Sequence, residues 1–335
     1  MPVTNGISSF QREDVNSRVF PCDKQGEIEM NNAITVHRRK RWFIRELPLH
    51  LMLLPAVVCT FIFHYLPMFG IVMAFQKFNP MLSFSGSKWV KWDNFRYVFR
   101  LSNFGTALTN SFEIAIVKVI LDLIVPLIIA LMLNEVRSNW FKRVSQTVYF
   151  LPFFLSWVVL GGVFRELFGL DGAVNTIISA ITGKKIFFLA NGRWMRTILY
   201  VTNIWKDQGY HMIIYLAAIT NVDSGLYEAA AIDGCGRVGQ CWHVTLPCIR
   251  PMIILLSTLS IGSIMSAGFD QIFNLYNPLV YDSVDIIDTF VYRLGLQQRQ
   301  YSVSAALGLF KSTVSLVLVG LSYYSAYKLS DYRIF

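Results

Sequence analysis

The stretch EAAAIDGCGRVGQCWHVTLP, residues 228–247, is a polar interruption between two long apolar segments of the chain. Those segments cover residues 194–220 before it and 253–273 after it. A helix that crosses a membrane needs roughly 20 predominantly apolar residues, because the hydrocarbon core of a bilayer is about 30 Å thick. Both flanking segments meet this length, so the stretch is expected to lie in water, within a loop at residues 221–252.

The whole chain has the composition of a membrane protein. Of its 335 residues, 54% are hydrophobic and only 15% are charged, which is too apolar for an ordinary soluble domain. Four more segments are long enough to cross, at residues 49–75, 106–134, 145–168 and 305–328. Backbone groups left unpaired in lipid are costly, so each segment is expected to be helical. The prediction is an all-α polytopic membrane protein with six transmembrane helices.

Charge sets the expected orientation. Residues 1–47 form a polar and basic segment without an evident signal peptide, and residues 48–330 form the transmembrane domain. Basic residues crowd the end of the first segment, at Arg38, Arg39, Lys40, Arg41 and Arg45. The positive-inside rule then favours a cytoplasmic N-terminus. Four crossings separate this cluster from Glu228, so the loop at residues 221–252 is also expected to be cytoplasmic.

Residues 173–190 are fairly apolar and would change that parity if they crossed the membrane. Gly183, Lys184 and Lys185 lie in their middle. A central lysine costs about 2.5 to 3.5 kcal/mol on insertion scales. We therefore expect an external interfacial helix and turn here.

The loop has the local signals of a short helix. Residues 226–232 include three consecutive alanines and are good helix formers. Asp223 or Ser224 can cap the start by accepting a backbone hydrogen bond. Gly234 and Gly236 can supply the left-handed backbone that ends a helix. Further on, Pro247 and Pro251 are expected to mark the approach to the next span.

The loop also carries a spaced motif. EAA at residues 228–230 is followed after three residues by Gly234, after nine more by Val244 where Ile is usual, and then by Leu-Pro. This pattern is the signature loop of bacterial ABC importer permeases, and the chain resembles that family. The resemblance implies a type I ABC importer permease fold. It also implies that the loop forms a coupling helix seated in a cleft of an ATP-hydrolysing subunit, with these residues at its core: Glu228, Ala229, Ala230, Gly234, Leu246 and Pro247.

The same resemblance implies partners. The chain has no phosphate-binding loop of the G-x-x-x-x-G-K-[ST] type, so ATP and Mg are expected on two separate ATPase subunits, and this chain is expected to bind no cofactor. A second permease subunit, expected to be a paralogue, and an extracytoplasmic solute-binding protein complete the assembly. No set of nucleophile, base and orienting residue is evident, so a transport subunit and not an enzyme is predicted.

Charge and cysteines point to no further ligand. The net charge of +9 fits attraction either to anionic lipid headgroups or to acidic solutes. Nucleic acid is not expected as a partner, because the basic residues flank membrane segments. Cys235, Cys241 and Cys248 with His243 match no familiar zinc spacing, so no metal site is predicted.

Three stretches narrow the resemblance to carbohydrate permeases: residues 92–99 (WDNFRYVF), 267–296 and 306–320. They are most similar to the lipoprotein-associated subgroup that imports oligosaccharides from complex polysaccharides, including pectin and alginate fragments. The resemblance implies import by alternating access across the bacterial cytoplasmic membrane. An importer of another polar solute such as a peptide, a membrane sensor that does not transport, and a secondary transporter are the alternatives.

Polar residues inside membrane segments are costly and usually face a cavity or a partner. The candidates for a substrate path are Lys206, Asp207, Tyr210, Asp270, Gln271, Asn274 and Asn277. Simpler explanations stay open. Lys118 and Asp122 are four residues apart on one helix and can neutralise each other, and charged side chains near helix ends can extend to the interface.

Overall fold

The computed structural model of the chain describes residues 47–262 and 264–330. The chain divides into two compact units, Met1–Phe69 and Gly70–Phe335, which we describe separately. The predicted polar segment at residues 1–47 lies outside the described residues except for Leu47. The first unit contains the start of the helix Leu47–Phe75, and the apolar side chains of residues 47–69 are exposed all round, which suits a membrane span.

The second unit begins with a small hairpin. Strand β1 (Gln76–Lys77) pairs antiparallel with β2 (Lys88–Trp89), so that Lys77 lies opposite Lys88. The short helix α2 (Ser83–Gly86) lies between the two strands. Within the described residues these are the only strands, and the predicted all-α class is confirmed.

Helices make up the rest of the unit. The α-helices are α3 (Asp93–Arg100), α4 (Ser102–Asn134), α5 (Asn139–Phe150), α6 (Trp157–Leu167), α7 (Ala173–Thr182), α8 (Gly192–Thr220), α9 (Ser224–Ile232), α10 (Arg237–Gln240), α11 (Leu246–Gly262), α12 (Phe269–Leu275), α13 (Tyr281–Val284), α14 (Ile287–Tyr292) and α15 (Tyr301–Ser330). Short 3₁₀ and π turns join them: η3 (Leu151–Phe154), η4 (Cys241–Thr245), η5 (Ile264–Ser266), η6 (Pro278–Val280) and η7 (Arg293–Gln297).

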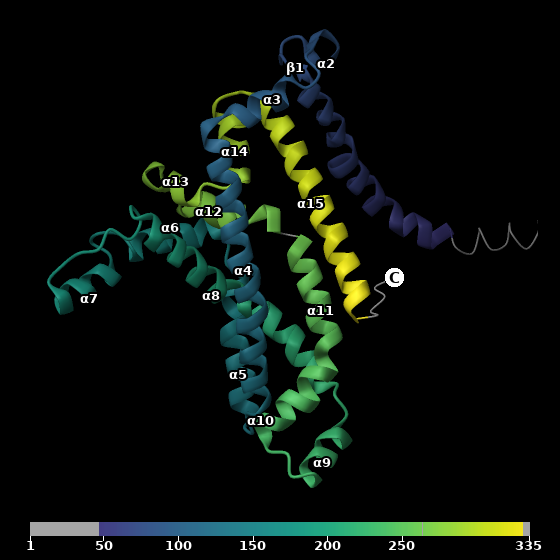
Figure 1. Ribbon diagram of the computed structural model, residues 1–335, viewed down its shortest axis with the longest axis vertical. Helices are drawn as coiled ribbons and strands as arrows, with labels where there is room; N and C mark the ends of the chain where they lie inside the picture. The colour runs from purple at the N-terminus through teal and green to yellow at the C-terminus, as the bar shows by residue number, and fades with distance from the viewer. Residues whose placement is uncertain (1–46, 263, 331–335) are drawn as a thin grey trace, which may run out of the picture. The chain divides into compact units, whose positions relative to one another are not determined.

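Helix α4 is the central element of this unit, and it contributes to all three hydrophobic clusters. Near its start, Phe104 packs with α14 and α15. In its middle, Ile114 packs with α8, α12 and α13. Near its end, Leu133 packs with α8 and α11. The hairpin and the start of α15 therefore lie at one end of the unit, and α9 lies at the other (Figure 1).

Four helices of the described residues are long and apolar enough to cross a membrane: Leu47–Phe75, Ser102–Asn134, Arg237–Gly262 and Tyr301–Ser325. A bent helix pair provides a fifth if it counts as one span. The predicted number of six is thus not reproduced by length and composition. The segment predicted at residues 194–220 is the continuous helix α8, but Lys206 and Asp207 interrupt its apolar residues.

The span predicted at residues 145–168 is broken. Asn139–Phe154 and Trp157–Leu167 meet at a bend of 99°. Leu155 adopts an extended backbone at the break, and Ser156 caps α6 by accepting a hydrogen bond from the Val159 N–H at 3.3 Å. The serine cap marks the start of a second helix with a different direction. The apolar composition of the segment did not predict this break.

The span predicted at residues 253–273 has different bounds. Its helix begins at Arg237 and ends at Gly262, so Pro247 and Pro251 lie within the helix and do not precede it. Gly268, with φ +84°, precedes α12. This left-handed backbone favours glycine, and an added Cβ would also lie 2.6 Å from the Lys118 Nζ atom.

Residues 173–190 form the expected helix and turn. Helix α7 ends at Gly183, which has φ +69°, and its ten residues are too few to cross a membrane. Beyond the turn, Lys185 Nζ forms an ion pair of 2.6 Å with Asp171, and this hydrogen bond lowers the pKa of Asp171. The external location of the segment stays a prediction.

Candidate coupling loop and buried polar sites

Helix α9 is defined at both ends by the residues that the sequence indicated. The Asp223 Oδ1 atom accepts a hydrogen bond of 3.0 Å from the Gly225 N–H, so the predicted cap is Asp223. Gly234 has φ +78°, and the Cys235 N–H donates to the Ala230 carbonyl at 2.9 Å. The prediction for Gly236 was wrong: its φ is −70°, and it precedes α10 as the N-cap.

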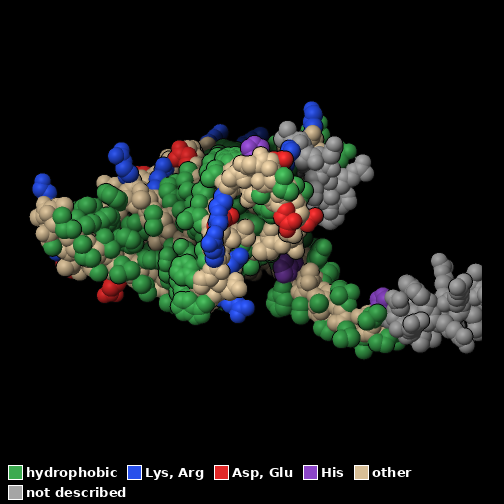
Figure 2. Space-filling view, turned by 90° about the horizontal axis from the view of Figure 1, so that it is seen from below, with side chains coloured by type: hydrophobic (Ala, Val, Ile, Leu, Met, Phe, Trp, Pro, Cys, Tyr) green, Lys and Arg blue, Asp and Glu red, His purple; other side chains and the backbone are tan. Residues whose placement is uncertain are grey.

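One surface of α9 is left uncovered by the rest of the unit. Glu228 and Ala229 are exposed and Ala230 is half-buried. Among the described residues Glu228 has no ion-pair partner. Large apolar side chains beside it are exposed as well, with Ile232 at 87%. Figure 2, which views the molecule from this end, shows acidic and basic side chains next to large hydrophobic areas. Such a surface suits contact with another protein.

The loop is also fastened to the helix that follows it. The Tyr227 hydroxyl lies 2.9 Å from Thr245 Oγ1, and Gln240 Nε2 donates to the Tyr227 carbonyl at 3.4 Å. Arg237 forms an ion pair of 2.6 Å with Glu135, the C-cap of α4. Sequence reasoning missed these residues, because contacts across 18 or 102 positions have no periodic signal.

The signature motif is divided between two elements. Glu228, Ala229 and Ala230 are in α9, and Gly234 ends it. Leu246 and Pro247 begin α11, which continues the helix that starts at Arg237. Leu246 packs in the hydrophobic cluster of α4, α8 and α11. Residues 233–236 separate α9 from the helix Arg237–Gly262, and the contacts of Tyr227 with Thr245 and Gln240 join the two elements across this turn.

One buried polar site joins α4, α8 and α12. Lys118 Nζ donates to the Ala267 carbonyl at 2.9 Å and to Gln271 Oε1 at 2.5 Å. Gln271 Nε2 donates to the Leu199 carbonyl at 2.7 Å and to Thr202 Oγ1 at 2.8 Å. All the polar atoms of the Gln271 side chain are thus satisfied inside the protein. This arrangement holds the break between α11 and α12 in place.

A second polar site lies where α8 meets η3 and α6. Lys206 Nζ donates to Asp207 Oδ1 at 3.2 Å and to the Phe153 carbonyl at 3.3 Å. The same atom lies over the Phe153 and Trp157 rings, 5.3 and 5.6 Å from their centroids. Tyr210 stacks on Phe153 with a centroid distance of 5.1 Å. The bend between η3 and α6 therefore creates an aromatic cage around one buried cation.

The other candidate path residues are separate from this cage. Asp270 is exposed, and Asn274 Nδ2 donates to its carbonyl at 2.8 Å within α12. Asn277 Nδ2 donates to the Leu189 carbonyl at 2.8 Å, and its Oδ1 caps η6. Asp122 accepts a hydrogen bond of 2.9 Å from Asn203 Nδ2 on α8. The structure thus brings Lys206, Asp207 and Tyr210 together, but not the whole predicted set.

No group of three or more His, Cys, Asp or Glu side chains in residues 47–262 and 264–330 could hold a metal ion. Cys235, Cys241 and Cys248 are free thiols in this part of the chain.

Four long apolar helices and a sharply bent helix pair give the described part of the chain the features of an integral membrane protein. Residues 122–335 match the family described as binding-protein-dependent transport system inner membrane component. The chain belongs to this family of ABC importer permeases.

Two relatives from Bacillus subtilis (strain 168) are each 40% identical to the chain. One is the protein LplB, aligned over 89% of this chain and 92% of its own length. The other is the polygalacturonan/rhamnogalacturonan transport system permease protein YteP, aligned over 89% and 94%.

Two solved structures have the same fold. One is a bacterial ABC transporter involved in import of the acidic polysaccharide alginate, with a TM-score of 0.81, 35% identity and coverage of 88% of this chain and 99% of that one. The other, with a TM-score of 0.80, 34% identity and the same coverage, is a bacterial alginate ABC transporter in complex with a periplasmic protein that holds an alginate pentasaccharide.

Proposed function

We propose that this chain is one of two permease subunits of an ATP-driven importer, and that it carries acidic oligosaccharides across the bacterial cytoplasmic membrane by alternating access. The observation that carries the proposal is α9. It combines the signature residues with an exposed surface, defined ends and a firm attachment to the helix Arg237–Gly262.

In this proposal α9 is the coupling helix, and the loop at residues 221–252 is cytoplasmic, as is the N-terminus. Glu228 pairs with a basic residue of an ATPase subunit, while Ala229 and Ala230 allow close approach. Gly234 ends the helix, and Leu246 and Pro247 join it to the span. Packed contacts move as a unit, so closure of the two ATPases, which hold ATP and Mg, displaces the helices of the permease.

The cargo is inferred from the relatives. YteP is named for polygalacturonan and rhamnogalacturonan, and both solved structures are of alginate importers. These polymers have uronate carboxylates in common. A paralogous second permease and an extracytoplasmic binding protein complete the assembly, and the chain itself performs no chemistry on the sugar.

The candidate path residues have unequal support for contact with sugar. Asp207 and Tyr210 belong to the cage of Lys206, where the aromatic rings suit sugar faces and the charged groups suit hydroxyls and carboxylates. Asp270 is exposed and Asn274 half-buried on α12. Gln271 and Asn277 are engaged in contacts between segments, so their role is to hold the break beside the path.

The test is reconstitution of the complete importer in proteoliposomes with its ATPases and binding protein. We expect ATP-dependent uptake of trigalacturonate, and hydrolysis of ATP that rises when the binding protein is loaded. Uptake of a peptide instead would indicate an importer for another solute. Stimulated hydrolysis without any uptake would indicate a sensor, and either result would overturn the proposal.

A further inference from the structure

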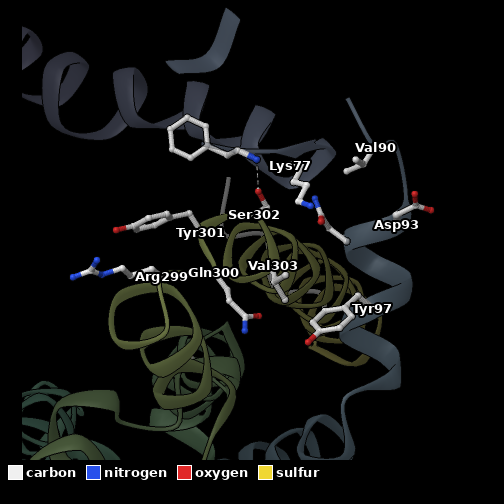
Figure 3. Close-up of a pocket in the computed structure, with 11 residues that line it drawn as sticks. Lys77, Val90, Asp93, Tyr97, Arg299, Gln300, Tyr301, Ser302 and Val303 are labelled. Carbon is white, nitrogen blue, oxygen red and sulfur yellow. Dashed lines mark hydrogen bonds between the residues drawn. The ribbon is translucent and has the colours of Figure 1, made fainter. Parts of the chain in front are cut away.

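A pocket of about 550 Å³ lies at the end of the second unit that carries the hairpin (Figure 3). It is lined by residues 77–78 after β1, by Val90 and one side of α3, and by residues 299–303 at the start of α15. Among the described residues that line it, none belongs to the coupling loop or to the predicted substrate path. In Figure 1 this end is opposite to α9.

Hydrogen bonds between the segments fix the walls of this pocket. The Phe78 N–H donates to Ser302 Oγ at 2.8 Å, which joins the hairpin to α15 (Figure 3). Asn94 Nδ2 donates to the carbonyls of Ala74 and Gln76 at 2.8 and 2.9 Å, which joins the hairpin to α3. A pocket of this size with fixed walls is typical of a preformed ligand site.

The pocket carries uncompensated positive charge. Lys77 and Arg299 both line it and are exposed. Within the described residues neither forms an ion pair, whereas Asp93, the acidic lining residue, pairs with Arg96 at 3.4 Å. Figure 3 shows the two cations on different sides of Ser302. Two separated cations suit a ligand with more than one carboxylate.

The pocket also holds an acceptor without a donor. The Oε1 atom of Gln300 is buried and has no hydrogen-bond partner, while its Nε2 donates to Gln298 at 3.5 Å. Buried polar atoms are nearly always paired, so this oxygen is suited to a hydroxyl of a ligand. The adjacent Arg299 has φ +58°, and strain of this kind in a residue other than glycine gathers at functional sites.

Aromatic side chains complete the lining. Phe78, Tyr97 and Tyr301 all contribute, and the rings of Phe78 and Tyr301 meet edge to face at 6.3 Å. Rings pack on the apolar faces of sugars, and phenol hydroxyls can bond to sugar hydroxyls. A small inorganic anion would use the cations but neither the rings nor the volume.

We propose that this pocket is a binding subsite for an acidic oligosaccharide on the extracytoplasmic face of the importer. Lys77 and Arg299 bind carboxylates of different sugar units, and Gln300 accepts a hydrogen bond from a sugar hydroxyl. The proposal rests on the proposed function, because the cytoplasmic location of α9 places the opposite end of the unit outside. The subsite shares no lining residue with the Lys206 cage and is a distinct binding site for the sugar.

The test is equilibrium binding of trigalacturonate to the complete importer in nanodiscs, without binding protein. We expect Lys77→Gln and Arg299→Gln each to weaken binding by about three- to tenfold. Fully methyl-esterified trigalacturonate has the same rings without the charges. We expect it to bind more weakly than trigalacturonate, with the same affinity for the parent and for all variants. Lys88→Gln is the matched control, because Lys88 lies opposite Lys77 in the hairpin, is exposed and does not line the pocket.

Three results would overturn the subsite. One is binding unchanged in both variants, and another is an equal loss with Lys88→Gln, which would show a diffuse charge effect. The third is unchanged sugar binding with weaker binding of sugar-free binding protein, which would assign the pocket to protein docking. Uptake by the parent importer is measured in parallel. If the parent importer takes up the sugar but both variants bind it as the parent does, the subsite alone is contradicted. If sugar binding depends on the two cations but the parent importer takes up no sugar, the proposed function alone is contradicted.

Discussion

At the scale of single residues, the structure separates side chains that hold the fold from side chains that are free to act. Lys118 and Gln271 satisfy each other inside the unit, and removal of either would leave a buried polar group unpaired. Glu228 is the opposite case, an exposed carboxylate without an ion-pair partner in the described part of the chain.

Glu228→Lys should therefore leave the permease folded but weaken its association with the ATPase subunits. Reversal of one charge at a docking surface replaces an attraction by a repulsion, and we expect about a tenfold loss of affinity or more. Co-purification of the ATPases and uptake in proteoliposomes measure it. Asp233→Lys, an exposed position just after α9, is the control for net charge. If the Glu228 variant binds the ATPases and supports uptake as the parent does, Glu228 is not part of the coupling site.

At the scale of elements, glycine conformation decides how α9 ends. Gly234 and Gly236 are two residues apart, and neither has a neighbour within 4 Å of an added Cβ. They differ in backbone conformation, since φ is +78° at Gly234, after the end of α9, and −70° at Gly236, the N-cap of α10. This pair is a matched test of whether the shape of the loop matters for coupling.

Gly234→Ala should strain the left-handed turn at a cost of about 1 to 2 kcal/mol, because a Cβ meets the following carbonyl in this conformation. We expect lower uptake per ATP hydrolysed, since the end of the coupling helix shifts. Gly236→Ala should behave as the parent does. Coupling ratios in proteoliposomes give the comparison, and equal ratios for both variants would contradict the role of the turn.

The ends of short helices could be predicted from the sequence, but the breaks within long apolar segments could not. The cap at Asp223 and the turn at Gly234 were predicted correctly, because both depend on neighbours in the chain. The helix bounds around residues 253–273 were wrong, and the segment at residues 145–168 is bent by 99°. Both differences come from breaks within apolar sequence. The first break is held by the contact between Lys118 and Gln271, and the second by a serine cap.

At the scale of the whole molecule, the two ends of the second unit are expected to face opposite sides of the membrane. We predict that α9 faces the cytoplasm and that the turn after α7 is external. Asp233→Cys and Lys184→Cys, each introduced into a cysteine-free chain, place a thiol at exposed positions of these segments.

A membrane-impermeant thiol reagent should label Lys184→Cys in intact spheroplasts and Asp233→Cys only in inverted vesicles. The cysteine-free chain is the background control. Labelling of Asp233→Cys from outside would place α9 on the external side, where it cannot contact a cytoplasmic ATPase, and would contradict the proposed function.

The sequence by itself determined the class of this protein: apolar length fixed a helical membrane fold, and the spaced motif at residues 228–247 marked a permease loop. These properties are local, since hydropathy and turn preference depend on adjacent residues. Only the tertiary structure decided the bends, the partners of Lys118 and Lys206, and the pocket between the hairpin and α15. Each of these depends on side chains brought together from distant positions, where hydrogen bonding and burial, not order in the chain, select the neighbour.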